Sequence, residues 1–256
     1  MARTRTALPG FSVTEYAGLL RDAAGAGYGL RPVEAMPDWD GERTLYLRHD
    51  VDIHIEGIDR VAEAEADVGA AATYFVPLTL HFNPAYPPNR AVLRALVALG
   101  HRIGLHYDLA GYPADEPAAW ARLEREVATL ADLVEAPVAS ICMHNPGLGG
   151  RDVFAAGGRF VHPHAFEDVV YVSDSCRAWR DETLLSLFGD DAPPRMLLNT
   201  HPELWLGDAA TPRSEFLART LVDNAVEPHV RYVHEDVGEI WAGHPGPRLH
   251  DAREAS

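Results

Sequence analysis

Short apolar segments alternate with longer amphipathic segments along most of the chain. Runs of apolar and β-branched residues, bounded by glycine, proline or polar residues, are typical of buried strands. Such runs occupy residues 43–50, 71–78, 101–108, 138–145, 168–175 and 195–202. We therefore expect a strand in each of these six segments.

The segments between these runs have helical spacing and helix-boundary residues. Ser12 and Glu15 form a capping-box pattern before an apolar stretch. Asn89 is placed to cap a later helix, and Pro117 suits the first turn of another. Helices are therefore predicted over residues 12–27, 55–69, 89–100, 116–134 and 213–226.

Alternating strands and helices are typical of a parallel sheet with helices packed outside it. This pattern predicts an α/β fold, either a barrel or a doubly wound sheet. No internal repeat or long linker interrupts it, so we expect one domain over residues 1–242. Residues 243–256, rich in proline, glycine and charge, are predicted to form a flexible tail.

Composition excludes several classes of function. The 256 residues are 47% hydrophobic and carry a formal net charge of -16, which argues against nucleic acid as a partner. All 22 basic residues are arginine, so Schiff-base lysine chemistry is excluded. There is no run of 18 apolar residues and no apolar stretch after the N-terminal arginines, so we expect no membrane partner and a cytoplasmic location. Cys142 and Cys176 lack metal-site spacing, and we expect two reduced thiols.

Titratable side chains gather at the carboxyl ends of the predicted strands. In parallel α/β folds these ends meet on one rim, where active sites form. Core packing would favour apolar side chains there, so the repetition indicates a functional site. The residues concerned are Asp50, Asp52, His106, Asp108, His144, Asp174 and His201.

Asp50 and Asp52 are two residues apart, so their side chains face the same way on a strand. Two neighbouring carboxylates raise each other's pKa unless a cation lies close by. A divalent metal would relieve the repulsion by taking one carboxylate as a ligand, with His106 and another histidine completing three protein ligands. Catalytic zinc sites use such a set and keep a position open for water.

Six stretches, in this order, resemble motifs of the polysaccharide deacetylase (NodB-homology) superfamily, which includes carbohydrate esterase family 4. "RHDVD" followed by "GHRIGLHYD" is the most specific part, and the resemblance covers about residues 12–205. More narrowly, the chain resembles cytoplasmic NodB-like proteins of surface-sugar and natural-product gene clusters. The resemblance implies an irregular (β/α)7 barrel. The stretches are "LRHDVD", "TYFVPL", "GHRIGLHYD", "SICMHNP", "VSDSCRAW" and "LLNTHP".

The resemblance also implies roles for the rim residues. Asp50 matches the family's general base, and Asp52 matches its metal-binding aspartate. His106 matches the first metal-binding histidine, and His201 matches the general acid. Asp174 lies where the family places the aspartate that orients this acid.

The sequence departs from the family pattern at the third metal ligand. The usual second histidine, four residues after the first, is replaced by Ala110. We select His144 because it ends the next strand and imidazole suits zinc. Asp108, on the same face as His106, and His54 stay as alternatives.

Two further departures affect the carboxylates. The family's fourth-strand arginine, which holds the base, is replaced, and His144 stands in its place. Val51 separates two aspartates that are usually adjacent, so the roles of Asp50 and Asp52 could be exchanged.

Other side chains have less specific patterns. Trp179 lies where the family has an aromatic residue lining the site, whereas Trp205 and Tyr86 fit sugar stacking and core packing equally well. His162 and His164 could bind a metal, but a surface role is favoured for this proline-containing loop.

The combined pattern predicts a metal-dependent hydrolase that removes an acyl group, expected to be acetyl, from an N-acetylated amino sugar or a sugar-containing small molecule. Zn²⁺ is the expected metal, with Co²⁺ or Ni²⁺ as alternatives. Two other functions stay open: hydrolysis of a non-sugar amide or cyclic ureide, and non-catalytic sugar binding.

Overall fold

The computed structural model describes residues 5–80, 82–144, 152–155, 158–175 and 177–231. It groups the chain into two compact units, residues 1–213 and 214–256. The first unit contains the parallel sheet and the predicted site. Helix α5 (Arg213–Arg231), apart from its first residue, is the described part of the second. The predicted domain limits, 1–242 and 243–256, stay a prediction because most of the end of the chain lies outside the described residues.

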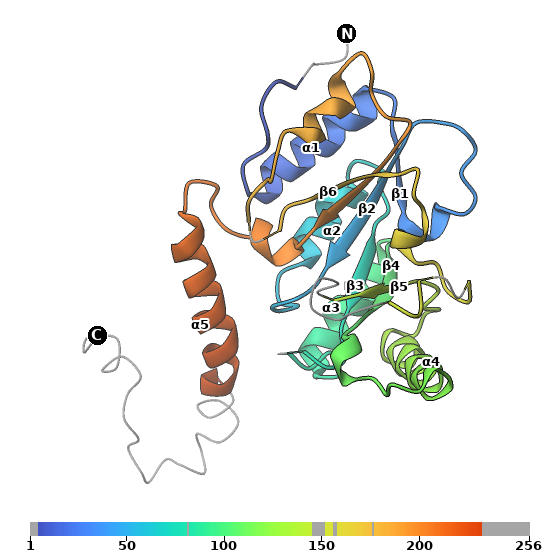
Figure 1. The fold of residues 1–256 in the computed structure, drawn as a ribbon. Helices are drawn as coiled ribbons and strands as arrows, with labels where there is room; N and C mark the ends of the chain where they lie inside the picture. The colour runs from blue at the N-terminus through green and yellow to red at the C-terminus, as the bar shows by residue number, and fades with distance from the viewer. Residues whose placement is uncertain (1–4, 81, 145–151, 156–157, 176, 232–256) are drawn as a thin grey trace, which may run out of the picture. The chain divides into compact units, whose positions relative to one another are not determined.

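One parallel sheet of seven strands forms the framework of the first unit (Figure 1). The strand order is β5-β4-β3-β2-β7-β6, and β1 pairs with the first half of β2. The curled sheet and its surrounding helices confirm the predicted irregular (β/α)7 barrel fold. The strands are β1 (Gly29–Pro32), β2 (Thr44–Asp50), β3 (Thr73–Val76), β4 (Arg102–Tyr107), β5 (Ile141–Met143), β6 (Val170–Ser173) and β7 (Arg195–Thr200).

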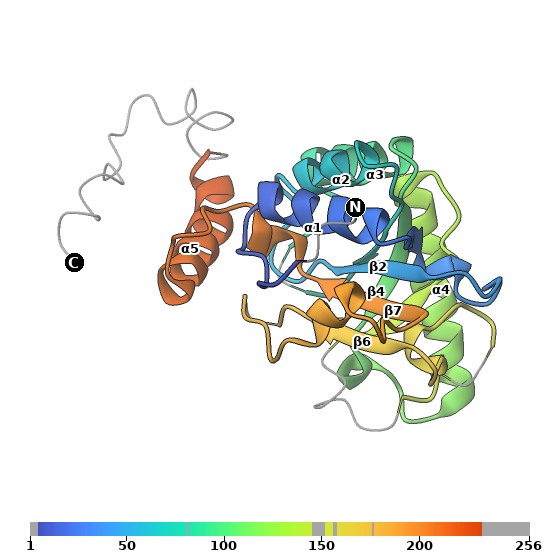
Figure 2. The same ribbon diagram turned by 90° about the horizontal axis from the view of Figure 1, so that it is seen from above.

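Four helices follow one another around the outside of the sheet, each contacting the next (Figure 2). They are α1 (Val13–Gly25), α2 (Asp59–Ala66), α3 (Pro87–Ala98) and α4 (Glu116–Val134). Ser12 caps α1 as predicted, because its side chain accepts a hydrogen bond from the Glu15 amide.

One predicted helix cap was wrong, and one strand was missed. Helix α3 begins at Pro87 and its N-cap is Tyr86, not Asn89, because proline is tolerated where helix amides need no partner. The Asn89 side chain instead donates to the Asn83 carbonyl. Strand β1 was missed because its four residues have no clear apolar pattern. It pairs in parallel with residues 44–47 of β2.

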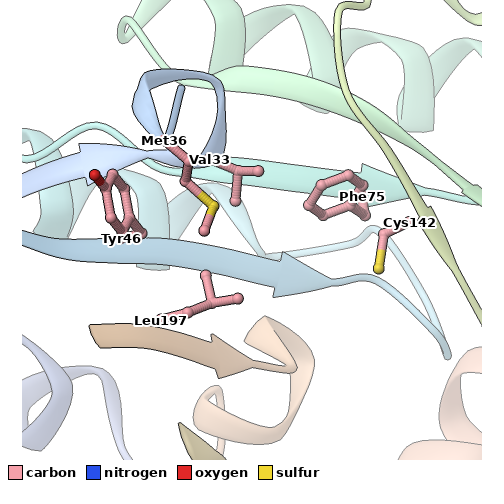
Figure 3. Close-up of a cluster of buried hydrophobic side chains, with 6 residues drawn as sticks. All are labelled: Val33, Met36, Tyr46, Phe75, Cys142 and Leu197. Carbon is pink, nitrogen blue, oxygen red and sulfur yellow. The ribbon is translucent and has the colours of Figure 1, made fainter. Parts of the chain in front are cut away.

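Beneath the strand ends, part of the barrel interior is apolar. Six buried residues form a cluster there: Val33, Met36, Tyr46, Phe75, Cys142 and Leu197 (Figure 3). Tyr46 and Asp50 lie four residues apart on β2 and so share the inner face of the strand. The cluster therefore supports the carboxylate end of β2 from inside.

Two side chains lie directly over Gly104 in β4. A Cβ atom there would lie 2.5 Å from a Phe75 ring carbon and 2.7 Å from the Ser140 hydroxyl oxygen. Glycine at this position therefore leaves room for the Phe75 ring and the Ser140 side chain, two residues before His106 on the same face of the strand.

Of the two cysteines, Cys142 is buried and free, as predicted, while Cys176 lies outside the described residues. Among the helices in the described part of the chain, none is long and apolar enough to cross a membrane.

Candidate metal centre and active site

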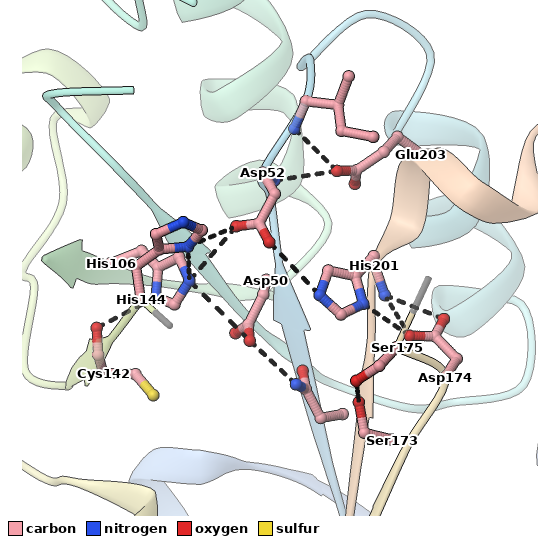
Figure 4. A network of polar contacts seen from close by, with 12 residues as sticks. Asp50, Asp52, His106, Cys142, His144, Ser173, Asp174, Ser175, His201 and Glu203 are labelled. Carbon is pink, nitrogen blue, oxygen red and sulfur yellow. Dashed lines mark hydrogen bonds and ion pairs between the residues drawn. The ribbon is translucent and has the colours of Figure 1, made fainter. Parts of the chain in front are cut away.

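Three side chains from separate strand ends meet above the apolar cluster (Figure 4). Asp52 follows β2, His106 lies in β4 and His144 follows β5. Asp52 Oδ1 lies 3.4 Å from His106 Nε2 and 3.3 Å from His144 Nδ1, and the two ring nitrogens are 3.3 Å apart. The three predicted metal ligands therefore present one atom each to a common point.

These spacings fit a metal ion. A tetrahedral ion with bonds of about 2.0–2.1 Å separates its ligand atoms by about 3.3 Å. Asp52 Oδ1 is buried and has no hydrogen-bond partner among the described residues, so this oxygen is available to a cation. One carboxylate oxygen and two imidazole nitrogens form a donor set that suits Zn²⁺, Co²⁺ or Ni²⁺.

The backbone orients the first histidine for this role. His106 Nδ1 lies 3.1 Å from the Cys142 carbonyl oxygen, to which it donates when protonated at that nitrogen. Its other nitrogen, Nε2, then faces Asp52 with a free lone pair. A carbonyl that fixes the ring and its tautomer in this way is a common feature of metal-binding histidines.

The alternatives for the third ligand are less well placed. Asp108 accepts a hydrogen bond from the Ala110 amide and caps a short 3-10 turn. His54 belongs to no candidate ligand group within the described residues, and burial lowers its pKa to about 4. A second group joins Asp50, His106 and Cys142, but burial raises the pKa of the Cys142 thiol, which disfavours the thiolate needed for binding.

Asp50 lies beside the ligand cluster but is held by other groups. Arg48 Nε and one terminal nitrogen lie 2.8 and 2.7 Å from its two carboxylate oxygens, and Asn199 Nδ2 donates to it over 2.9 Å. Burial raises the pKa of Asp50, but the charge of Arg48 outweighs this and lowers it to about 2. Asp50 is therefore a carboxylate at neutral pH.

Arg48 is an arginine beside Asp50 that was not identified from the sequence. His144, which stands where the family has the arginine that holds its base, lies in the ligand cluster. Arg48, two residues before Asp50 on the same strand, makes the bidentate contact and is 2% exposed. The remaining terminal nitrogen of Arg48 donates to His164 Nε2 over 3.1 Å.

His201 faces the same cluster from the end of β7. Its Nε2 lies 3.4 Å from Asp52 Oδ2, and its Nδ1 lies 2.6 Å from Asp174 Oδ1. Burial lowers the pKa of His201, but the Asp174 carboxylate outweighs this and raises it well above its ordinary value. Trp205 Nε1 donates to the other oxygen of Asp174 over 2.7 Å.

The remaining predicted residues have mostly structural surroundings. Trp205 is fully buried, which excludes sugar stacking, and Trp179 stacks on Phe11 and donates to the Pro9 carbonyl. His162 is 1% exposed and lies 3.0 Å from Asp152, so the expected surface role was wrong for it. A proline-containing loop can pack against the rest of the fold and bury its side chains, and the loop sequence alone does not reveal such burial.

Sequence reasoning missed three residues that support the site: Arg48, Asn199 and Glu203. Arg48 and Asn199 lie on the inner faces of β2 and β7, two residues from Asp50 and His201. Residues two apart on a strand face the same side, so their spacing from Asp50 and His201 was the signal that could have identified them. Glu203 gave no such signal, because it lies in a short 3-10 turn (Pro202–Trp205).

No protein-family model matches the chain, and no curated protein matches it. Solved structures do match, at low identity. A family 4 carbohydrate esterase from Bacillus anthracis is 15% identical, with 94% of this chain and 92% of that chain covered and a TM-score of 0.42. The peptidoglycan deacetylase PdaC from Bacillus subtilis is 13% identical, with 79% and 100% covered and a TM-score of 0.45.

A CE4 family pseudoenzyme from Bacillus anthracis is 14% identical, with 73% of this chain and 62% of that chain covered and a TM-score of 0.45. A mutant of it with restored enzymatic activity also matches, and this chain spans 64% of its length. These matching structures are thus a family 4 carbohydrate esterase, a peptidoglycan deacetylase and a CE4 family pseudoenzyme with its reactivated mutant.

Proposed function

We propose that this protein is a metal-dependent N-deacetylase that hydrolyses the amide of an N-acetylated amino sugar. One observation carries the proposal: the Asp52–His106–His144 cluster lies beside both a carboxylate, Asp50, and a histidine–aspartate pair, His201 and Asp174. Amide hydrolysis needs a site for a polarised carbonyl, a proton acceptor and a proton donor. In this proposal the ligand cluster holds the ion that polarises the carbonyl, Asp50 accepts a proton and His201 donates one.

Asp52, His106 and His144 would hold the metal, most suitably Zn²⁺. When bound, such an ion polarises a carbonyl oxygen and makes water more acidic. Asp50, with its pKa lowered to about 2, is in the form that accepts the proton of the attacking water. Its bidentate contact with Arg48 fixes the direction from which it does so.

His201 acts as the proton donor to the departing amine. The raised pKa keeps its imidazole protonated at neutral pH, as a general acid requires. Asp174 holds Nδ1, so the proton that is transferred is the one on Nε2, which faces the cluster. When the amine has left, the same pair can recover its proton from solvent for the next turnover.

The substrate we favour is a small, soluble, sugar-containing intermediate. This choice goes together with a cytoplasmic location, which we also propose. Nucleotide-linked N-acetyl sugars and N-acetylated glycosides are the first candidates to assay.

The test is acetate release from N-acetylated amino sugars by the zinc-loaded protein. Asp50→Asn and His201→Ala should each lower kcat by about 10²- to 10⁴-fold while the protein stays folded. Asp108→Asn is the matched control, because this rim carboxylate caps a turn outside the ligand cluster. Activity near the parent level in either catalytic variant would refute the assignment.

A further inference from the structure

Glu203 joins two distant parts of the candidate site and has no assigned role. Its carboxyl group is completely buried in the 3-10 turn Pro202–Trp205 that follows β7. One oxygen, Oε1, accepts hydrogen bonds from the backbone amides of Asp52 and Ile53, each over 2.9 Å (Figure 4). These contacts connect residues about 150 positions apart in the sequence.

The two amides have no strand partner. The pairing of β2 with β3 ends at Asp50 opposite Phe75, with a last bond from the Val51 amide to the Phe75 carbonyl. Pairing of β2 with β7 ends even earlier, at His49. The backbone at Asp52 therefore leaves the sheet, and Glu203 supplies the acceptor that a neighbouring strand would otherwise provide.

The position of the Asp52 side chain depends on this backbone. Its Oδ1 must lie within 3.4 Å of both imidazole nitrogens for the three ligand atoms to share an ion. A shift of the Asp52 backbone would widen these distances directly. Glu203 thus acts on the metal ligand through the main chain and not through the ion.

The turn that carries Glu203 is itself firmly held. Arg177 Nε donates to the Leu204 carbonyl over 3.2 Å, and Trp205 Nε1 is bonded to Asp174. The same turn begins directly after His201. One short segment therefore fixes both the metal-binding aspartate and the proton donor relative to β7.

The carboxyl group at this place meets a specific requirement. Its Oε2 has no partner among the described residues, and burying an unbonded oxygen costs free energy. An apolar side chain would avoid that cost but would leave the Asp52 and Ile53 amides without their acceptor. The requirement is therefore for an acceptor facing the two amides.

We propose that Glu203 is a positioning residue that sets the Asp52 backbone for metal binding. The inference rests on the proposed metal site and adds a residue to it. Replacing a group that positions a metal ligand typically weakens metal binding by about 10- to 100-fold. Glu203→Met, which keeps the volume but removes the acceptor, should have an effect of this size.

The test is titration of the metal-free, full-length protein with Co²⁺, followed by visible absorption and by competition with a chelator. Glu203→Met should weaken Co²⁺ binding about 10- to 100-fold. Glu203→Gln keeps an amide oxygen for both N–H donors and should bind within about 3-fold of the parent. Thermal unfolding of each metal-free variant separates metal affinity from folding.

The outcomes are distinguishable. Tight binding by Glu203→Met overturns the inference and leaves the metal site intact, and weak binding by Glu203→Gln also overturns it, because the acceptor is then not the cause. If the parent binds no Co²⁺, the metal site and the inference fall together. Should Glu203→Met not fold, Glu203→Asp replaces it, since its carboxylate is one methylene too short to reach both amides and should weaken binding to a similar degree.

Discussion

Replacing Arg48 by methionine tests the physical basis of the site. Arg48 lies inside the barrel, is 2% exposed, and gives two of its nitrogens to Asp50. Arg48→Met leaves a buried carboxylate with Asn199 as its one hydrogen-bond donor among the described residues. Methionine fills much of the space, so the loss of charge pairing dominates over the loss of packing.

The expected cost can be bounded. Removing one partner of a buried ion pair typically costs about 3–5 kcal/mol. Asp50 can avoid the unpaired charge by taking up a proton, which at pH 7 costs about 4 kcal/mol for a carboxyl of ordinary pKa. We therefore expect Arg48→Met to lower the free energy of unfolding by about 3–4 kcal/mol at pH 7.

The pH dependence of this cost has a definite sign. In the parent, the lowered pKa of Asp50 contributes stability above its unfolded-state pKa of 3.8, and this is lost as pH falls towards 2. Without Arg48, burial raises the pKa, so the variant loses stability as pH rises. The cost of the substitution should therefore shrink by about 2 kcal/mol between pH 7 and pH 5.

Urea unfolding of the metal-free proteins at both pH values measures these costs. Asp50→Asn in the Arg48→Met background is the control, since a neutral amide no longer needs the guanidinium. That double variant should be more stable than Arg48→Met alone. A cost below about 1 kcal/mol at pH 7, or a cost that grows at pH 5, would refute the idea of a buried, charged pair.

Three further predictions concern single groups. His144→Ala should weaken Zn²⁺ binding at least about 100-fold, whereas Asp108→Ala should leave it nearly unchanged in calorimetric titration. The metal-free protein should lose stability as the pH falls from 6.5 to 4, because burial lowers the His54 pKa to about 4 and charging this side chain opposes folding. His54→Gln should make that loss smaller by about 2 kcal/mol. An unchanged loss in urea unfolding over this pH range would contradict the prediction. Trp205→Phe removes the donor to Asp174 and should lower kcat about 10-fold with little change in KM, so an altered KM alone would argue against its supporting role.

The strand ends could be predicted from the sequence because each follows a run of apolar residues. Asp50, His106 and His201 each terminate such a run, and parallel topology brings these ends to one rim. The choice of His144 over Asp108 also agrees with the candidate ligand cluster, because β5 lies next to β4 in the sheet. Local pattern and strand order were enough for these residues.

The supporting residues could not be predicted in the same way, because they act across long sequence separations. Glu203 reaches Asp52 through a turn whose path depends on the packing of Trp205, and Arg48 looked like an ordinary strand residue beside "HDVD". His162 was expected at the surface because proline-containing loops often lie there. Tertiary packing determines burial in these cases, and the local sequence does not encode it.

Anomalous diffraction from a crystal soaked in Co²⁺ tests the central claim most directly. The account predicts one ion bound by a carboxylate oxygen of Asp52 together with His106 Nε2 and His144 Nδ1, with Asp50 and His201 close by but not bound to it. An ion held by a different set of side chains, or no ion at this rim with the three residues in place, would contradict it.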